Sequence, residues 1–218
     1  YFGLYKSTVH NILSTLKAME YLEQDEETGK YRLGIQIFNL SKALGDTYSI
    51  TKIAGPYMQE LSNYTGERCY LAVPYRQEVL YLDAMYPADS IELMRSILGE
   101  RAQMHCTGLG KAMLANMGER EISDYLEHHK LEAFTENSII DKKQFREELL
   151  RTKQRGYALD DMEHEFGIKC IAMPVFDRTK NVYAAISISG MANHFTDANI
   201  AEWAMLLKKY IRKIESRL

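Results

Sequence analysis

The sequence predicts an α+β protein with a short N-terminal part, made of helices and one hairpin, and a larger C-terminal part built on an antiparallel sheet. Three observations support this class. The 218 residues and the 46% hydrophobic content suit one large domain or two small ones with a real core. Before residue 49, apolar residues at helical spacing surround two short extended runs. From residue 51 onward, β-rich runs joined by polar turns occur in blocks between helical segments.

Composition restricts the classes of function. A net charge of −3 excludes a non-specific nucleic-acid coat, although it leaves room for a small DNA-reading surface. The three cysteines are scattered and form no CxxC pair, which is typical of a reducing cytosol rather than of a disulfide scaffold. No apolar run reaches the length of a membrane span and no secretory leader precedes the fold. We therefore expect a cytoplasmic protein that does not contact the membrane.

The first element is the stretch KSTVHNILSTLKAMEYL, residues 6–22, which predicts an amphipathic helix. One face carries Val9, Ile12, Leu13, Leu16 and Met19 and is expected to be buried. The other face has no Asp or Glu between residues 6 and 18, whereas an ordinary solvated face mixes Glu with Lys. Because a surface that approaches phosphates must exclude carboxylates, this face is a candidate for reading DNA. The predicted contacts are Lys6, Ser7, Thr8, His10 and Asn11; the alternative is a plain helix with a solvated polar face.

The second element is a hairpin, in which the runs at residues 21–24 and 30–34 flank the polar turn DEETG. A helix-turn-helix followed at once by a hairpin is a winged helix, whose second helix enters the major groove. The acidic tip, residues 25–27, counts against this interpretation because it would repel phosphates. The opening residues YFGL have the pattern of a helix end and a tight turn. We therefore expect residues 1–34 to be a winged helix-turn-helix whose first part is absent.

The remaining elements follow in order. A connecting helix is expected over residues 35–48, and residues 49–218 form the larger domain. In that domain the pattern predicts helices over residues 51–64, 109–117, 119–129, 142–155 and 197–218, with strands at ERCYLAVPY, QEVLYLDAMYP, IELMRSIL, YALDDM, IKCIAMPVFD and VYAAISISG.

The motifs KSTVHNIL, TGKYRLG, HCTGLGKAMLA, RGYALDDMEHEFGIKCIAMPVFD and AAISISG occur in this order over nearly the whole chain. Together they resemble the IclR-type bacterial transcription regulators. The resemblance implies a winged helix, a linker helix and a C-terminal GAF-like effector domain. It also implies that a small-molecule effector, such as a small organic acid or related metabolite, controls binding to operator DNA. It also implies homodimers, often paired into homotetramers, and no cofactor. Tyr5 and Asn11 depart from the family pattern, and Asn prefers adenine where the Arg that is common there prefers guanine.

The glycine-rich segment HCTGLGKAMLA fails the test for a phosphate loop, because His105 and Ala112 stand where that motif needs Gly and Ser or Thr. What remains is a glycine-rich entry to a helix. The backbone N–H groups of Gly108 and Leu109 could bind an anion there. The alternative is a tight turn that packs the helix closely on the sheet. The resemblance places the effector beside this loop.

Two further segments supply candidate effector contacts. Adjacent carboxylates at residues 160–165 match no calcium-loop spacing, so we expect no metal site. Ser187 and Ser189 share one face of a strand, with Ile186 and Ile188 on the other. With the resemblance, the expected effector site comprises Met94, Gly108, Leu109, Asp160, Ile168, Cys170, Ser187 and Ser189. No Arg or Lys is expected in it, so hydroxyls and backbone N–H groups would hold a small acid.

The rival class is a GAF-like sensor or an enzyme that acts on a small molecule through Cys170 or Asp160. Such an enzyme needs a nucleophile–base or acid–base pair. No such pair is legible around either residue, and free cysteines in apolar strands are usually small buried hydrophobes. We therefore expect no catalytic residue.

Overall fold

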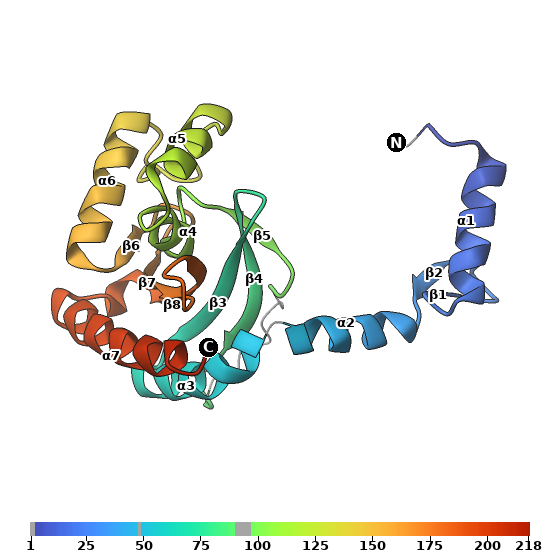
Figure 1. Cartoon of the computed structure of the whole chain (residues 1–218), viewed down its shortest axis with the longest axis horizontal. Helices are drawn as coiled ribbons and strands as arrows, with labels where there is room; N and C mark the ends of the chain where they lie inside the picture. Colours follow the sequence, from blue (N-terminus) through green and yellow to red (C-terminus); the bar gives the residue numbers. More distant parts are fainter. Residues whose placement is uncertain (1–2, 48, 90–96) are drawn as a thin grey trace. The chain divides into compact units, whose positions relative to one another are not determined.

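The computed structural model describes residues 3–47, 49–89 and 97–218, and the chain divides into two compact units, residues 1–49 and 50–218 (Figure 1). The first unit contains α1 (Lys6–Ala18), β1 (Leu22–Gln24), β2 (Tyr31–Leu33) and α2 (Gln36–Thr47). The helix, the hairpin and the second helix occur where the sequence predicts them. Among the described residues, this unit holds one helix and the hairpin of the expected winged helix-turn-helix.

The hairpin of the first unit is antiparallel and pairs Leu22 with Leu33 and Gln24 with Tyr31. Gly34 follows it and is buried against the backbone of Glu20, where a Cβ atom would lie 2.1 Å from the carbonyl oxygen. The glycine is therefore required for the chain to turn from the hairpin into α2.

The predicted burial of the apolar face of α1 does not occur among the described residues. Val9 and Ile12 remain 39% and 46% exposed, and no residue of α1 is buried. Leu13 and Leu16 are only half-buried. The physical reason is that a three-residue strand is the main element packed against this helix, and it is too small to cover its apolar face.

The second unit is a six-stranded antiparallel sheet with helices on both faces, which confirms the α+β class (Figure 1). The strand order is β5-β4-β3-β8-β7-β6. The strands are β3 (Arg68–Tyr75), β4 (Glu78–Met85), β5 (Arg101–Gln103), β6 (Ala158–Asp161), β7 (Ile168–Phe176) and β8 (Val182–Met191). The helices are α3 (Ser49–Thr65), α4 (Gly108–Leu114), α5 (Glu119–His128), α6 (Lys142–Arg155) and α7 (Asp197–Glu215), with a 3-10 turn, η1, at Ala192–His194.

One predicted strand, IELMRSIL, lies outside the described residues except for Ile97 and Leu98, and these two residues are not in a strand. The described edge strand next to β4 is β5, which the sequence did not predict and which pairs Leu80 with Arg101 and Glu78 with Gln103.

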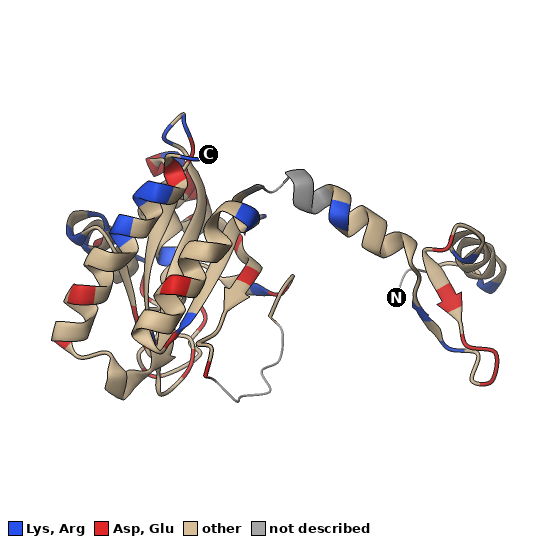
Figure 2. Cartoon of the chain, turned by 90° about the horizontal axis from the view of Figure 1, so that it is seen from below, with Lys and Arg blue, Asp and Glu red and all other residues tan. Residues whose placement is uncertain are grey.

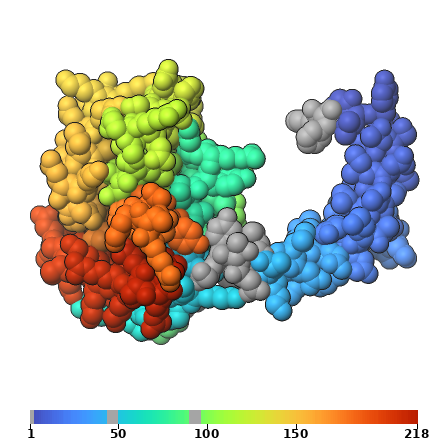
Figure 3. Space-filling view, viewed as in Figure 1, coloured from blue at the N-terminus to red at the C-terminus, as the bar shows by residue number. Residues whose placement is uncertain are grey.

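Two apolar layers enclose the sheet. Helices α3 and α7 cover one face, which carries Leu71, Ile171, Ile186 and Ile188. Helices α4, α5 and α6 cover the other face, which is built from small residues such as Ala72, Ala158, Ala172 and Ala185. The surfaces of α5 and α6 lie side by side in Figure 3, in lime and yellow. Small residues let α4 approach the sheet closely, and the space beside its first turn is where a cavity forms.

Candidate functional site

The polar face of α1 is fully exposed in the first unit. Lys6, Ser7, Thr8, His10 and Asn11 are all solvent-accessible, and the first turn contains no acidic residue. Tyr5 precedes the helix without a side-chain cap, so the helix N-terminus keeps backbone N–H groups that face solvent. The exposed polar side chains and the free N–H groups are suited to bind phosphate oxygens near the start of the helix and base edges one turn further on.

The acidic hairpin tip is largely used to build its own turn (Figure 2). The Asp25 carboxylate accepts hydrogen bonds from the Thr28 N–H at 2.6 Å, the Thr28 hydroxyl at 2.7 Å and the Glu27 N–H at 3.1 Å. The bonds from Thr28 hold the pKa of Asp25 below its usual value. On the adjacent strands, Glu23 pairs with Arg32 at 2.7 Å. The Asp25 carboxylate therefore keeps its negative charge and is used to build the turn, while Arg32 balances the charge of Glu23 on the strands.

A cavity of about 180 Å³ opens between the sheet and the start of α4 in the second unit. Seven predicted effector residues line it: Gly108, Leu109, Asp160, Ile168, Cys170, Ser187 and Ser189. The eighth, Met94, lies outside the described residues. Residues from four separate parts of the sequence thus surround one space.

Strand register explains why these residues meet. Asp160 of β6 lies opposite Cys170 of β7, Cys170 lies opposite Ser189 of β8, and Ser189 lies opposite Arg68 of β3. Residues directly opposite one another in a sheet share a face. Asp160, Cys170, Ser189 and Arg68 therefore form one row across four strands, which we call the polar row. Ser187 belongs to the next row, as the predicted alternation along its strand requires.

The expectation that no Arg or Lys joins the site is wrong. Arg68 and Arg101 both line the cavity, together with Tyr70 and Tyr81. The alternation in ERCYLAVPY places Arg68 and Tyr70 on the face of the strand opposite Cys69. The sequence could therefore have predicted that these two residues share a face. The sequence did not reveal that β3 would pair with β8, and this long-range pairing brings Arg68 to Ser189.

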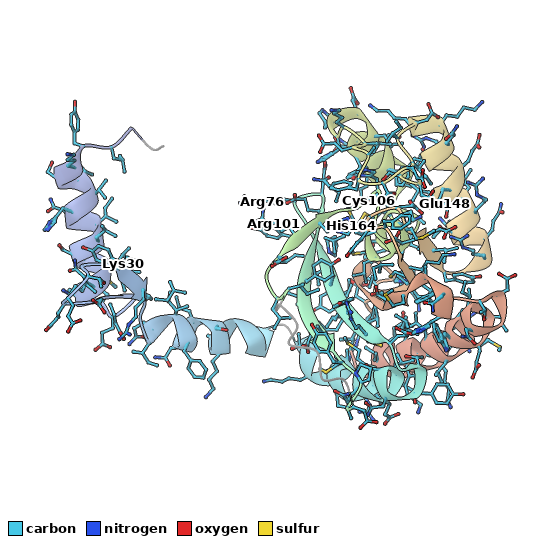
Figure 4. The ribbon with its side chains drawn as sticks, turned by 180° about the vertical axis from the view of Figure 1, so that it is seen from behind. Lys30, Arg76, Arg101, Cys106, Glu148 and His164 are labelled. Atoms are coloured by element: carbon cyan, nitrogen blue, oxygen red, sulfur yellow. The ribbon has the colours of Figure 1, made fainter. Side chains whose placement is uncertain are left out.

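The two arginines differ in their surroundings. Arg101 lies 3.3 Å from Glu78, and its guanidinium stacks over the Tyr75 ring at 4.9 Å, beside Arg76 at the tip of the β3–β4 hairpin (Figure 4). Arg68 lies within the sheet, where it lowers the pKa of Tyr70 against the larger raising effect of burial. Arg68 is thus the cation placed in the polar row, and Arg101 belongs to a separate cluster at the hairpin tip.

Ser187 carries an unpartnered hydroxyl. Its side chain is fully buried, and its Oγ has no hydrogen-bond partner among the described residues. The neighbouring Cys170 thiol directs its own hydrogen bond to the Ile171 carbonyl at 3.7 Å. A buried polar atom without a partner costs about 1–3 kcal/mol. The hydroxyl is therefore available to a polar group inside the cavity.

Asp160 is buried at the other end of the polar row, and burial raises its pKa to about 7. Its Oδ1 accepts a hydrogen bond from the Glu163 N–H at 2.8 Å. Glu163 in turn forms an ion pair with Lys111, which is completely buried on α4 and also bonds the Leu159 carbonyl at 2.5 Å. This buried pair fixes the turn that carries Asp160, at a position that faces the cavity.

Cys106 and His164 form a contact that the sequence did not reveal, because 58 residues separate them. The thiol Sγ lies 3.5 Å from Nδ1 of the imidazole (Figure 4). Burial raises the pKa of Cys106 to about 12 and lowers the pKa of His164. Burial likewise raises the pKa of Cys170. These environments favour neutral thiols, whereas thiol nucleophiles need a lowered pKa.

Neither a metal cluster nor a membrane-spanning helix is found in the part of the chain that the structure describes. There, no three His, Cys, Asp or Glu side chains converge on a point that could hold a metal ion, and no helix is long and apolar enough to cross a membrane.

Comparisons with known proteins identify relatives of this chain. A sequence model of the C-terminal domain of the bacterial transcriptional regulator IclR matches residues 42–216. The transcriptional regulator XynR of Escherichia coli is 32% identical over 207 residues, covering 95% of this chain and 82% of XynR. The crystal structure of Thermotoga maritima IclR superposes with a TM-score of 0.83 at 29% identity, covering 100% of this chain and 87% of that one.

A third relative is known with a small acid. An IclR homologue from Microbacterium hydrocarbonoxydans, crystallised with 4-hydroxybenzoate, superposes with a TM-score of 0.85 at 23% identity. The match covers 98% of this chain and 85% of that one. At this identity the match shows a shared fold.

These relatives are transcriptional regulators, and they identify the class of this protein as a DNA-binding transcriptional regulator controlled by a small-molecule effector. The family match extends over most of the chain. The chain belongs to the IclR family of bacterial transcriptional regulators.

Proposed function

We propose that this regulator reads its operator with α1 and senses a small organic acid in the cavity of its second unit. The observation that carries the proposal is the convergence of seven residues, which the family resemblance implied as effector contacts, on one cavity that contains the unpartnered Ser187 hydroxyl. The volume of about 180 Å³ is smaller than the ~300–1,000 Å³ of pockets for drug-sized ligands, so a small metabolite fits it best.

A carboxylate suits the polar groups of the cavity. Ser187, Ser189 and Arg68 offer two hydroxyls and a guanidinium along adjacent strands. Charge-assisted hydrogen bonds of this kind are stronger than those between neutral groups. The acid bound to the Microbacterium homologue agrees with this ligand class. The proposal contains no catalytic step, because the buried cysteines are held as neutral thiols.

Operator recognition is assigned to Lys6, Ser7, Thr8, His10 and Asn11. Two copies of α1 are needed, since one recognition helix makes too few contacts for a specific site, and a two-fold axis places a second helix one DNA turn away. We therefore propose a homodimer or homotetramer. Because bacterial operators lie in the cytoplasm, the protein acts there.

The experiment that tests this function starts from an operator selected by the full-length protein out of random-sequence DNA. Binding to the selected DNA should weaken steeply with salt, because phosphate contacts release counterions. A small organic acid should then shift the operator affinity of the same protein. Failure to select any sequence, or an operator affinity that no organic acid changes, would reject the proposal.

A further inference from the structure

The C-terminal half of α7 presents a dense group of Lys and Arg side chains to solvent (Figure 2). Of the six exposed positions between Lys208 and Arg217, five are basic and the sixth is Ser216. The turn between β7 and β8 lies beside this end of the helix, because the Phe176 N–H donates to the Glu215 carboxylate at 2.9 Å. It adds two more exposed cations. We call this surface the basic face; it comprises Arg178, Lys180, Lys208, Lys209, Arg212, Lys213 and Arg217.

Neighbouring acids do not neutralise the basic face. None of its seven cations forms an ion pair with a carboxylate in the described part of the chain. Glu215 already accepts the backbone N–H at the end of β7. Asp177 accepts the N–H groups of Thr179 and Asn181, at 2.8 and 3.0 Å, and so closes its own turn. The face therefore keeps an excess of positive charge, although the whole chain carries −3.

The composition of the basic face distinguishes between kinds of partner. A specific protein interface has a core of apolar or aromatic side chains that lose water on binding. No exposed position between residues 208 and 217 carries an apolar side chain, so the face offers no such core. Interfaces with nucleic acid are more polar and much more positively charged. The phosphates of duplex DNA therefore fit this surface better than an acidic protein does.

The charge of the first unit supports the same partner. Residues 1–49 contain five Lys or Arg and six Asp or Glu, so they carry a small excess of acid. Neutralisation of phosphates by Lys and Arg supplies nearly all of non-specific DNA binding and often a large share of specific binding. DNA that is held by α1 is also present at a high effective concentration for a second contact in the same assembly.

We propose that the basic face is a second DNA-binding surface, which binds the phosphates of duplex DNA without reading their sequence. The inference goes beyond the proposed function, because it adds a DNA contact from the second unit to the contact made by α1. Phosphate contacts carry no sequence information by themselves. The basic face should therefore add affinity and salt dependence, while α1 still selects the operator.

Three cations of the basic face can be changed without disturbing the packing of α7 on α3. Lys213 Nζ and Arg217 Cζ lie 5.7 and 5.2 Å from the centroid of the Tyr57 ring, so these two also hold the helices together and are kept. The other three cations of α7 contact no aromatic ring within the described residues. The test variant carries Lys208→Gln, Lys209→Gln and Arg212→Gln in the full-length protein.

The measurement is the salt dependence of DNA binding. Fluorescence anisotropy of a labelled random-sequence duplex of about 30 base pairs gives the binding constant between about 50 and 200 mM salt. Each lost phosphate contact should reduce the slope of log K against log salt by about 0.9, so the variant should lose about 2 to 3 from the slope per protomer. Its affinity at the low-salt end should fall about tenfold or more.

Lysines of α6 provide the matched control, with Lys142→Gln, Lys143→Gln and Lys153→Gln in one variant. They are exposed, and α6 covers the other face of the sheet. This control changes the net charge by the same amount, so its salt slope should stay that of the unmodified protein. The fluorescence of the buried Trp203 checks that both variants are folded.

The outcomes separate this inference from the proposed function. An unchanged slope in the α7 variant, or an equal reduction in the α6 control, would overturn the inference and leave operator reading by α1 intact. Polyglutamate of matched charge is the competing probe. If it binds the unmodified protein more tightly than the duplex does, and the α7 variant loses that binding, the face serves an acidic protein and the inference is also overturned.

Discussion

At the scale of single residues, the hydroxyls of the buried Ser187 and the half-buried Ser189 on β8 are the most direct contacts for a ligand. Replacing Ser187 and Ser189 by Ala removes them without adding bulk, so the strand should keep its packing. The effector affinity should fall by about tenfold to a hundredfold, since each lost hydrogen bond to a buried polar group costs on the order of 1–3 kcal/mol. Calorimetric titration of the effector measures this loss.

Ser62 provides a matched control for the two serines. Its buried hydroxyl donates to the Glu67 carbonyl at 2.6 Å, on the face of the sheet away from the cavity. Ser62→Ala should lower the free energy of unfolding by about 1 kcal/mol and leave effector affinity unchanged. Equal loss of affinity in both variants would show that the effect of the β8 serines is on stability rather than on contact.

Asp160 should leave a signature in the pH dependence of stability. Its pKa rises on folding from 3.8 to about 7, so the folded state binds this proton more tightly than the unfolded state. Its contribution is therefore complete below about pH 4 and is lost as pH rises to about 7, with an upper bound of ~4 kcal/mol at ~1.36 kcal/mol per pKa unit. Asp160→Asn should remove this part of the slope.

Trp203 reports the transition, because it is the only tryptophan and lies buried against Phe195 in the second unit. Its fluorescence during urea unfolding gives the free energy of unfolding at each pH. If the difference between the original protein and Asp160→Asn does not change between about pH 4 and pH 7, burial does not raise the pKa of Asp160 as described.

The sequence was informative about individual cavity residues where strand alternation decides the face. It separated Ser187 and Ser189 from Ile186 and Ile188, and the structure agrees. Arg68 was missed although its own strand alternates clearly. Its neighbouring strand is chosen by packing between residues that are 121 positions apart, Arg68 and Ser189, and the local pattern carries no information about that pairing.

At the scale of elements, α4 packs closely on the segment before it because of its glycines. A Cβ atom on Gly110 would lie 2.3 Å from the backbone of Met104, which cannot move away as a flexible side chain does. Gly110→Ala should therefore lower the free energy of unfolding by about 1–3 kcal/mol through overpacking. Chemical denaturation followed at Trp203 measures the change.

Gly55 in α3 is the matched control. A Cβ atom there meets only the Met85 side chain, at an ordinary 3.5 Å. Because Ala has the higher helix propensity, Gly55→Ala should raise the free energy of unfolding by about 0.4–1 kcal/mol. Gly110→Ala with no loss of stability would mean that α4 lies further from Met104 than described.

Most elements were predictable because their apolar periodicity is strong. Helix α6 was bounded by Gly156 as expected, and β7 and β8 flank the turn at residues 177–181. The edge strand β5 was not predicted. It has only three residues, Arg101–Gln103, and it owes its extended form to pairing with β4 rather than to its own pattern.

At the scale of the whole molecule, exposed apolar side chains in the first unit indicate a partner surface. Val9, Ile12, Phe38 and Leu40 are all 39% exposed or more, and large exposed apolar side chains are common at interfaces. We expect light scattering of the full-length protein to give the mass of a dimer or tetramer at micromolar concentration. A stable monomer would contradict two-fold reading of the operator.

The central claim is that operator reading and effector sensing reside in separate parts of the chain and are coupled in the assembled protein. Titrating operator binding against effector tests it most directly, with the unmodified protein, Thr8→Ala, His10→Ala, and the Ser187→Ala plus Ser189→Ala variant. Thr8→Ala or His10→Ala should weaken operator binding by roughly 1–3 kcal/mol with effector affinity unchanged. The double serine variant should bind the operator normally and respond only at about tenfold to hundredfold higher effector concentrations. A double variant that responds at the effector concentrations of the unmodified protein would contradict the account.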